Sequence, residues 1–361
     1  MKFIITKKQS KRLIKEALGV PTAVNLWVDT FSSLIKDGLL MLLSSDDQEI
    51  FFSGDEVQNK AVSLGWNSSN KNFKSFPLAE PNLNLTINVV PDSQIKKGDD
   101  YIQNASFDTS DMDIREATFD DGLTTTLFVG GTINIEISIP KSSYDNGDFV
   151  ELYDKDIKPY AEAVLFHELT HVVEFYNRVI SGTATPNFEQ VSNLTQMLNK
   201  MGSIDDWDEL MFLIYLHLSF ELNARVSEVY GLLRNKQINS KDEFIEFLKN
   251  SRAFSYAKRL KNFSSERFIK DLEIPQSTID RIRDFDGKKT SIEEIKDVVL
   301  RQLIDNWSDT YQSFLADFSA DDNLKIPELS PTVTSSPENF LKFWENRFNK
   351  AGEDSIRKIS R

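Results

Sequence analysis

The hydrophobic pattern of this 361-residue chain changes its period once, and that change limits the folds open to it. Between about residues 48 and 140 apolar and polar residues alternate, most regularly at 82–89 and 132–139. Beyond residue 153, apolar residues recur every three or four positions. Alternation is typical of strands with one buried face, and the longer period is typical of amphipathic helices. We therefore predict an α+β fold that is mainly helical, with a small antiparallel or mixed sheet preceding the helices.

The pattern also predicts an order of segments. We expect a helical N-terminal segment, an α+β core, a helical region, and a linker followed by a C-terminal helix, at 1–47, 48–235, 236–325 and 326–361 respectively. A single helix is expected over 206–233. Ser-x-x-Glu sequences at 240–243 and 291–294 have the form of capping boxes, which satisfy free N–H groups where a helix begins.

Composition excludes several classes of function. The formal net charge of −14 argues against a nucleic-acid partner, since phosphate binding needs a basic surface. No run of 18 apolar residues is present, so we expect no membrane span, and the first residues lack the apolar centre of a signal peptide. We expect a cytoplasmic protein, and nothing in the pattern indicates an oligomeric state. With no cysteine, disulfides and thiolate metal ligands are impossible.

The most informative motif is His167-Glu168-Leu-Thr-His171, inside an apolar-periodic segment at 160–176. On a helix the four-residue spacing places both imidazoles on one face, where they can bind a single Zn²⁺. Glu168 follows the first histidine and is placed to take a proton from a water on that metal. The other interpretation is a surface helix with two unrelated histidines. Because the chain has only 3 histidines and 2 stand here, we favour the metal site.

A zinc site needs a third protein ligand and, for catalysis, an open position. The predicted helix at 212–230 is very apolar, yet one stripe of it is polar, and burying unpaired polar groups is costly. The residues that share this stripe are His217, Glu221, Ala224, Arg225 and Glu228. From the residues alone the third ligand is His217, a carboxylate of this stripe, or a backbone group.

Together these motifs resemble the zincin metallopeptidases, in particular the thermolysin-like branch with a glutamate as third zinc ligand. Members pair His-Glu-x-x-His with a later Glu-x-x-Ala, and Glu221-Leu-Asn-Ala224 follows His171 after 50 residues. The similarity covers about residues 127–232. It implies a zincin-like core with one Zn²⁺ per chain on His167, His171 and Glu221, with Glu228 and His217 as alternatives to Glu221. The chain departs from the family at Arg225, where many members carry an acidic or amide residue that orients a histidine.

The resemblance implies a zinc-dependent metallopeptidase that acts on a peptide or protein substrate, with Glu168 as general base. Arg225 is expected to pair with Glu221 or Glu228, and Glu174 is a candidate to hold an imidazole N–H. The candidate side chains for stabilising an oxyanion are Tyr160, Tyr176, Tyr215, Tyr230 and His217. Zincins bind extended peptides on an edge strand above the active-site helix, and we expect that strand at 126–139, with Asn134 and Glu136 facing the cleft.

A rival hypothesis is a non-catalytic, zincin-like structural or binding protein in which zinc only stabilises two helices. Most of the chain has no catalytic signature, and its first residues resemble the starts of proteins from large tailed bacteriophages. That likeness suggests a phage-encoded or virion-associated protein. Glu168 favours the enzyme, because a structural site has no need for that carboxylate.

Overall fold

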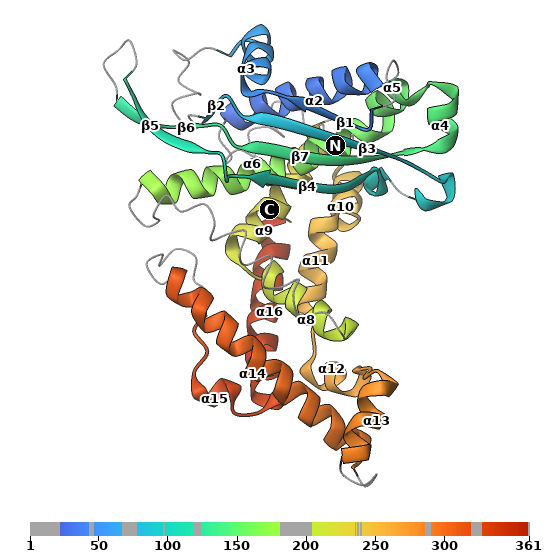
Figure 1. The fold of residues 1–361 in the computed structure, drawn as a ribbon, viewed down its shortest axis with the longest axis vertical. Coiled ribbons are helices and arrows are strands. Elements are labelled where there is room, and N and C mark those ends of the chain that lie inside the picture. Colours follow the sequence, from blue (N-terminus) through green and yellow to red (C-terminus); the bar gives the residue numbers. More distant parts are fainter. Residues whose placement is uncertain are drawn as a thin grey trace. The chain divides into compact units, whose positions relative to one another are not determined.

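The computed structural model describes residues 22–42, 47–66, 78–96, 98–118, 124–180, 204–234, 236, 238, 240–285, 290–318 and 327–359. It divides into two compact units (Figure 1). The first comprises Met1–Pro186 and Asn223–Phe247, and the second comprises Asn187–Leu222 and Leu248–Arg361. Among the described residues, 204–222 group with the C-terminal helices. The part of the predicted N-terminal segment before residue 22 lies outside the described residues.

The first unit is built on a four-stranded mixed sheet in the order β1-β3-β7-β4. Its strands are β1 (Glu49–Phe52), β3 (Asn82–Val90), β4 (Ile102–Asp108) and β7 (Thr132–Pro140). β3 and β7 run parallel, while β1 and β4 are antiparallel to their neighbours. A second sheet joins β2 (Leu78–Ala79), β6 (Thr124–Val129) and β5 (Asp113–Thr118) in the order β2-β6-β5.

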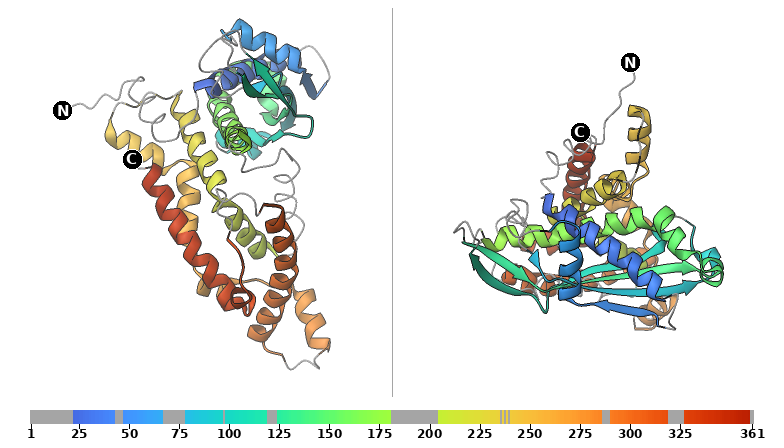
Figure 2. Two further views of the ribbon diagram at one scale, coloured as in Figure 1. Left: turned by 90° about the vertical axis from the view of Figure 1, so that its left-hand side faces the viewer. Right: turned by 90° about the horizontal axis from the view of Figure 1, so that it is seen from above.

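The alternating pattern places one face of the four-stranded sheet in the core. Leu83 pairs with Ile133 and Leu85 with Ile135, and all four side chains are buried. Two long helices pack against each other on this side, α2 (Thr22–Leu42) beside β3 and α6 (Lys158–Ile180) beside β4 (Figure 2). The opposite face carries the polar residues of the alternation.

The predicted edge strand at 126–139 is wrong in two respects. Gly130 and Gly131 have φ of +88° and +82° and break the segment into β6 and β7, which belong to different sheets. β7 lies inside its sheet between β3 and β4, so its edges are already paired. Since Ile133 and Ile135 face the helices, Asn134 and Glu136 point to the other face of the sheet. Among the described strands, the edge strand of the four-stranded sheet that lies beside α6 is β4.

Shorter helical elements complete the first unit. They are α3 (Gly54–Ser63), η2 (Asp92–Gln94), η3 (Gly98–Tyr101), α4 (Lys141–Asn146), α5 (Phe149–Leu152) and a π-helical turn, η4 (Tyr153–Ile157), that leads into α6. Two further helices cross the divisions between the units: α9 (Ser219–Arg234) and α10 (Lys241–Lys249).

The second unit is helical throughout its described residues. Its helices are α8 (Asp205–Leu216), α11 (Arg252–Lys261), α12 (Ser265–Asp271), α13 (Gln276–Phe285), α14 (Ile292–Phe318), α15 (Pro331–Thr334) and α16 (Pro337–Ile359). Trp207, Trp307 and Trp344 are fully buried in its core. The capping box that begins α14 is present, because Ser291 and Glu294 exchange side-chain to backbone hydrogen bonds.

The helix predicted over 206–233 is two helices, α8 and α9, separated at His217 and Leu218. The His217 ring packs between Trp344 and Phe348, and its Nδ1 contacts the carbonyl oxygen of Ile214. The N–H of Leu218 donates instead to Tyr215, in a tighter turn that ends α8. The apolar period cannot reveal this break, because the residues on both sides of it are buried.

The fold class is therefore α+β and mainly helical, with small mixed sheets before the helix that carries the histidine motif, as predicted. Among the described helices, none combines the length and apolar character that a membrane span requires.

Candidate metal centre

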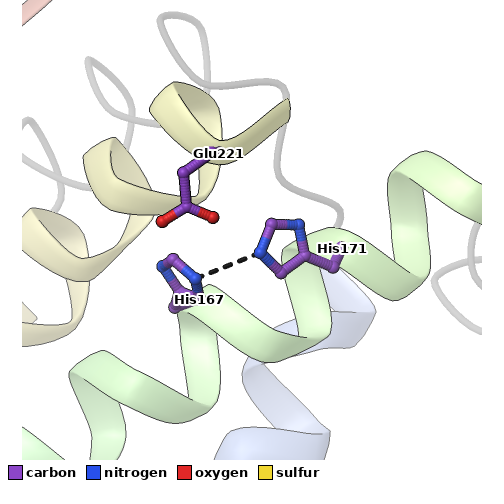
Figure 3. A group of neighbouring side chains, drawn as sticks. All are labelled: His167, His171 and Glu221. Carbon is purple, nitrogen blue, oxygen red and sulfur yellow. Dashed lines mark hydrogen bonds between the residues drawn. The ribbon is translucent and has the colours of Figure 1, made fainter. Parts of the chain in front are cut away.

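The two histidines of the motif lie one turn apart on α6 and face the same point (Figure 3). Their Nε2 atoms are 3.1 Å apart, and the rings meet edge to face with centroids 4.7 Å apart. His167 is buried and His171 is partly exposed. The helical spacing has thus placed two nitrogen donors where one ion can contact both.

Glu221 points at the same place from the first turn of α9 (Figure 3). Its side chain is completely buried, and one of its oxygens lies within 4.8 Å of donor atoms of both histidines. Of the candidate third ligands, this is the one that joins the two imidazoles in a metal-ligating cluster. The division between the two units falls just after Leu222, so Glu221 stands on the same continuous helix as residues 223–234 of the first unit.

Small residues allow α6 and α9 to approach closely. A Cβ at Gly231 would lie 2.5 Å from the Cα of Ala163, so a larger residue at 231 would force the helices apart. Ala224 is fully buried, as the Glu-x-x-Ala pattern led us to expect. Between these points the hydroxyl of Thr170 donates to that of Ser227 at 3.0 Å. The close packing brings the carboxylates of α9 within reach of the imidazoles.

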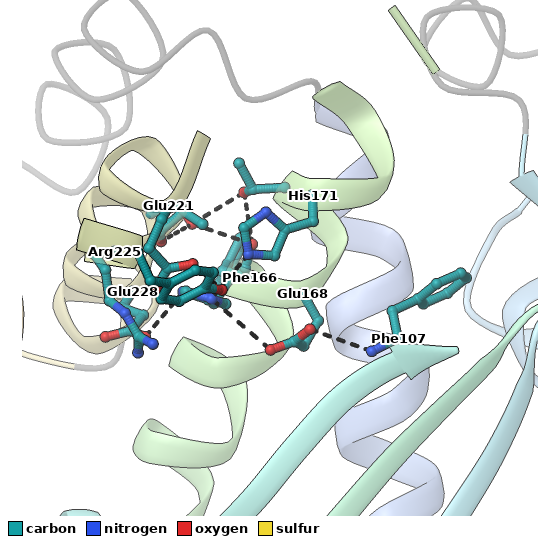
Figure 4. Close-up of polar contacts among 12 residues, drawn as sticks. Phe107, Phe166, Glu168, His171, Glu221, Arg225 and Glu228 are labelled. Carbon is teal, nitrogen blue, oxygen red and sulfur yellow. Dashed lines mark hydrogen bonds and ion pairs between the residues drawn. The ribbon is translucent and has the colours of Figure 1, made fainter. Parts of the chain in front are cut away.

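Glu228 lies beside the other nitrogen of His167. Its Oε1 is 3.0 Å from Nδ1 of His167, and the same oxygen accepts a hydrogen bond from Nη1 of Arg225 at 2.6 Å (Figure 4). Both α9 side chains are largely buried, with 7% exposure for Glu228 and 18% for Arg225. Of the two partners predicted for Arg225, the described contact is with Glu228. This pair is enclosed, unlike an ordinary pair on a helix surface.

Tyr215 supports the Glu221 carboxylate. Its hydroxyl donates to Oε2 of Glu221 at 2.6 Å, across the break between α8 and α9. The hydrogen bond fixes the orientation of the carboxylate that faces the histidines. Tyr215 is one of the tyrosines that the sequence offers as oxyanion candidates. On a single continuous helix its position relative to Glu221 does not predict this hydrogen bond.

Glu168 lies between the cluster and the edge of the sheet (Figure 4). Its Oε1 is 3.9 Å from Nε2 of His167, and its Oε2 accepts a hydrogen bond from the backbone N–H of Phe107 at 3.2 Å. Phe107 belongs to β4, the edge strand. A backbone donor carries no side-chain signal, so the sequence could not have indicated this partner.

The remaining predicted residues have other surroundings. Glu174 accepts a hydrogen bond from Asn223 at 2.9 Å, which joins α6 to α9. Tyr230 is hydrogen-bonded to Asn25 at 2.9 Å, and Tyr176 is buried with its ring against Phe128. His217 sits in the aromatic core of the second unit, where burial lowers its pKa to about 4. These contacts hold His217 and Tyr230 outside the cluster of His167, His171 and Glu221.

The donor set fits a divalent cation of the zinc type. Two imidazole nitrogens and one carboxylate oxygen are the ligands that Zn²⁺ takes in hydrolytic sites. Carboxylates favour a cation beside them, so the acidic side chains next to the two imidazoles are compatible with a 2+ ion.

Comparison of the chain with protein-family models, with curated proteins and with solved structures gives no significant match. The geometry of His167, His171 and Glu221 is therefore the basis for a proposed function.

Proposed function

We propose that this protein is a zinc-dependent peptidase of the zincin type, with one Zn²⁺ per chain on His167, His171 and Glu221. One observation carries the proposal: three side chains with the ligand chemistry of hydrolytic zinc converge, and a fourth, Glu168, lies beside them. Three protein ligands are typical of catalytic zinc sites, which keep a position open, whereas structural sites usually have four. The presence of Glu168 also favours an enzyme over the scaffold of the rival hypothesis.

Bound zinc would supply Lewis acidity, which lowers the pKa of a water molecule on it to about 7. Glu168 accepts the proton as the water oxygen adds to the carbonyl carbon of the scissile peptide bond. It then passes that proton to the amide nitrogen as the C–N bond breaks, so the products are a carboxylic acid and an amine. Tyr215, hydrogen-bonded to Glu221, is the predicted oxyanion candidate whose described contact joins the cluster.

The edge of β4 that no described strand pairs with is the proposed site for an extended peptide. The N–H of Phe107 points away from β7, because it donates to Glu168. Backbone N–H and C=O groups alternate in direction along a strand, so those of Ala105 also point away from β7. Those of Ser106 face Asn134 on β7. A peptide that pairs with this edge would lie next to Glu168.

The test is Glu168→Gln, assayed with fluorescein-labelled casein and a mixed peptide library. Glutamine keeps the size and polarity of the side chain but is a very weak base, so we expect the zinc content to stay unchanged. Hydrolysis should fall by at least about 10²-fold. A variant that cleaves as fast as the wild type would contradict the proposed mechanism. A wild-type protein that holds zinc but cleaves none of these probes would favour the structural role.

A further inference from the structure

Glu221 and Glu228 stand two turns apart on the same face of α9, and both lie close to His167. Nε2 of His167 lies 3.1 Å from Nε2 of His171, its partner in the cluster, while Glu228 is 3.0 Å from Nδ1. A metal bound through Nε2 therefore leaves Nδ1 facing a carboxylate. The geometry excludes Glu228 from the cluster of ligand atoms and places it on the far side of the ring.

A neutral imidazole carries one proton, and the hydrogen bond made by one nitrogen decides which lone pair remains for a metal. An acceptor at Nδ1 holds the proton there and leaves the Nε2 lone pair directed at the cluster. The carboxylate of Glu228 is placed to become such an acceptor, because its Oε1 lies 3.0 Å from Nδ1, although the two groups are not aligned for a hydrogen bond in this structure. The same oxygen is fixed by the 2.6 Å hydrogen bond from Arg225. With 7% exposure, Glu228 has little water to compete for that contact.

We propose that Glu228, held by Arg225, is a positioning residue that fixes the tautomer and orientation of His167 for metal binding. This inference rests on the proposed metal site and assigns the orienting role that the residue at position 225 fills in many zincins. Here position 225 is an arginine, which orients the carboxylate one turn later instead of the histidine itself. Loss of such a partner typically weakens metal affinity 10–100-fold.

The test is a titration of the metal-free full chain with Co²⁺, in competition with a chelator, for the wild type, Glu228→Ala, Glu228→Gln and Glu221→Ala. The visible spectrum of bound Co²⁺ reports the ligand set, and the competition gives the affinity. For Glu228→Ala we expect one ion per chain, an unchanged spectrum, and affinity that is about 10–100-fold weaker. Glu228→Gln keeps an acceptor for Nδ1–H and should recover part of that loss. Glu221→Ala should change the spectrum.

Glu162→Gln is the matched control for a merely structural role. Glu162 is also a buried glutamate that faces an arginine of α9, since its Oε2 lies 3.8 Å from Nη1 of Arg234. We expect its Co²⁺ affinity to equal that of the wild type. Unchanged affinity in Glu228→Ala, or an equal loss in the Glu162 control, would overturn the positioning role. A changed spectrum in Glu228→Ala would make Glu228 a ligand. A wild type that binds no Co²⁺ would overturn the metal site itself.

Discussion

At the residue scale, the three histidines of the chain have two different environments. His167 and His171 face carboxylates across α6 and α9, whereas His217 packs against Trp344 and Phe348. Burial lowers the pKa of His217 from 6.5 to about 4, so the ring is neutral in the folded chain. The same residue type thus serves as a candidate ligand in one place and as an aromatic core residue in another.

The buried His217 should make stability depend on pH. Between pH 6.5 and about 4 the unfolded chain binds a proton that the folded chain does not, so this contribution is complete above pH 6.5 and is lost as the pH falls. From pH 7 to pH 5, His217 should account for a loss of about 2 kcal/mol in the free energy of unfolding. Urea denaturation at both pH values should show this extra loss in the wild type and not in His217→Leu. Parallel losses in the two proteins would contradict the prediction.

The spatial neighbours of individual residues can be predicted from the sequence where helix geometry alone fixes them. The four-residue spacing of His167 and His171 ensures that both rings share a face, and the structure brings them together with Glu221. The partner of His167 Nδ1 was harder to predict, because Glu228 is adjacent to it only through the packing of α9 on α6. The signal was the seven-residue interval between Glu221 and Glu228, which equals two helical turns.

At the element scale, the site depends on three features: helix α9 and the edge strand β4, which contact α6, and the break before α9. The break turns Tyr215 toward Glu221, and β4 offers the N–H of Phe107 to Glu168. Neither contact follows from apolar periodicity, which reports the buried face of an element and not the neighbour it meets. The misplaced edge strand has the same cause, since β4 is polar and partly exposed.

Two proline substitutions distinguish the roles of the two edges of β4. Ala105→Pro removes an N–H from the edge that no described strand pairs with, where proline is tolerated, so the protein should stay folded but lose at least about tenfold in kcat/KM on labelled casein. Ser106→Pro removes an N–H that faces β7 and should cost about 1–3 kcal/mol of stability. Thermal unfolding and the casein assay measure both effects. Full activity in Ala105→Pro would argue against peptide binding at this edge.

At the scale of the whole molecule, the change in hydrophobic period correctly predicts a mainly helical α+β chain. The described residues 204–222 group with the C-terminal helices, from which they are distant in the sequence. Local patterns specify elements, whereas contacts between distant segments depend on packing that one sequence does not reveal. The polypeptide passes out of the first unit and returns to it within α9, the helix that carries both glutamates.

The most direct test of the central claim is the zinc content of the full chain, purified without chelator and measured by atomic emission together with protein concentration. We predict one zinc per chain in the wild type, loss of it in His171→Ala and Glu221→Ala, and retention in His217→Leu. Glu228→Ala should hold zinc at saturating concentration and release it more readily to a chelator. A wild-type protein without zinc, or undiminished zinc in Glu221→Ala, would contradict the account.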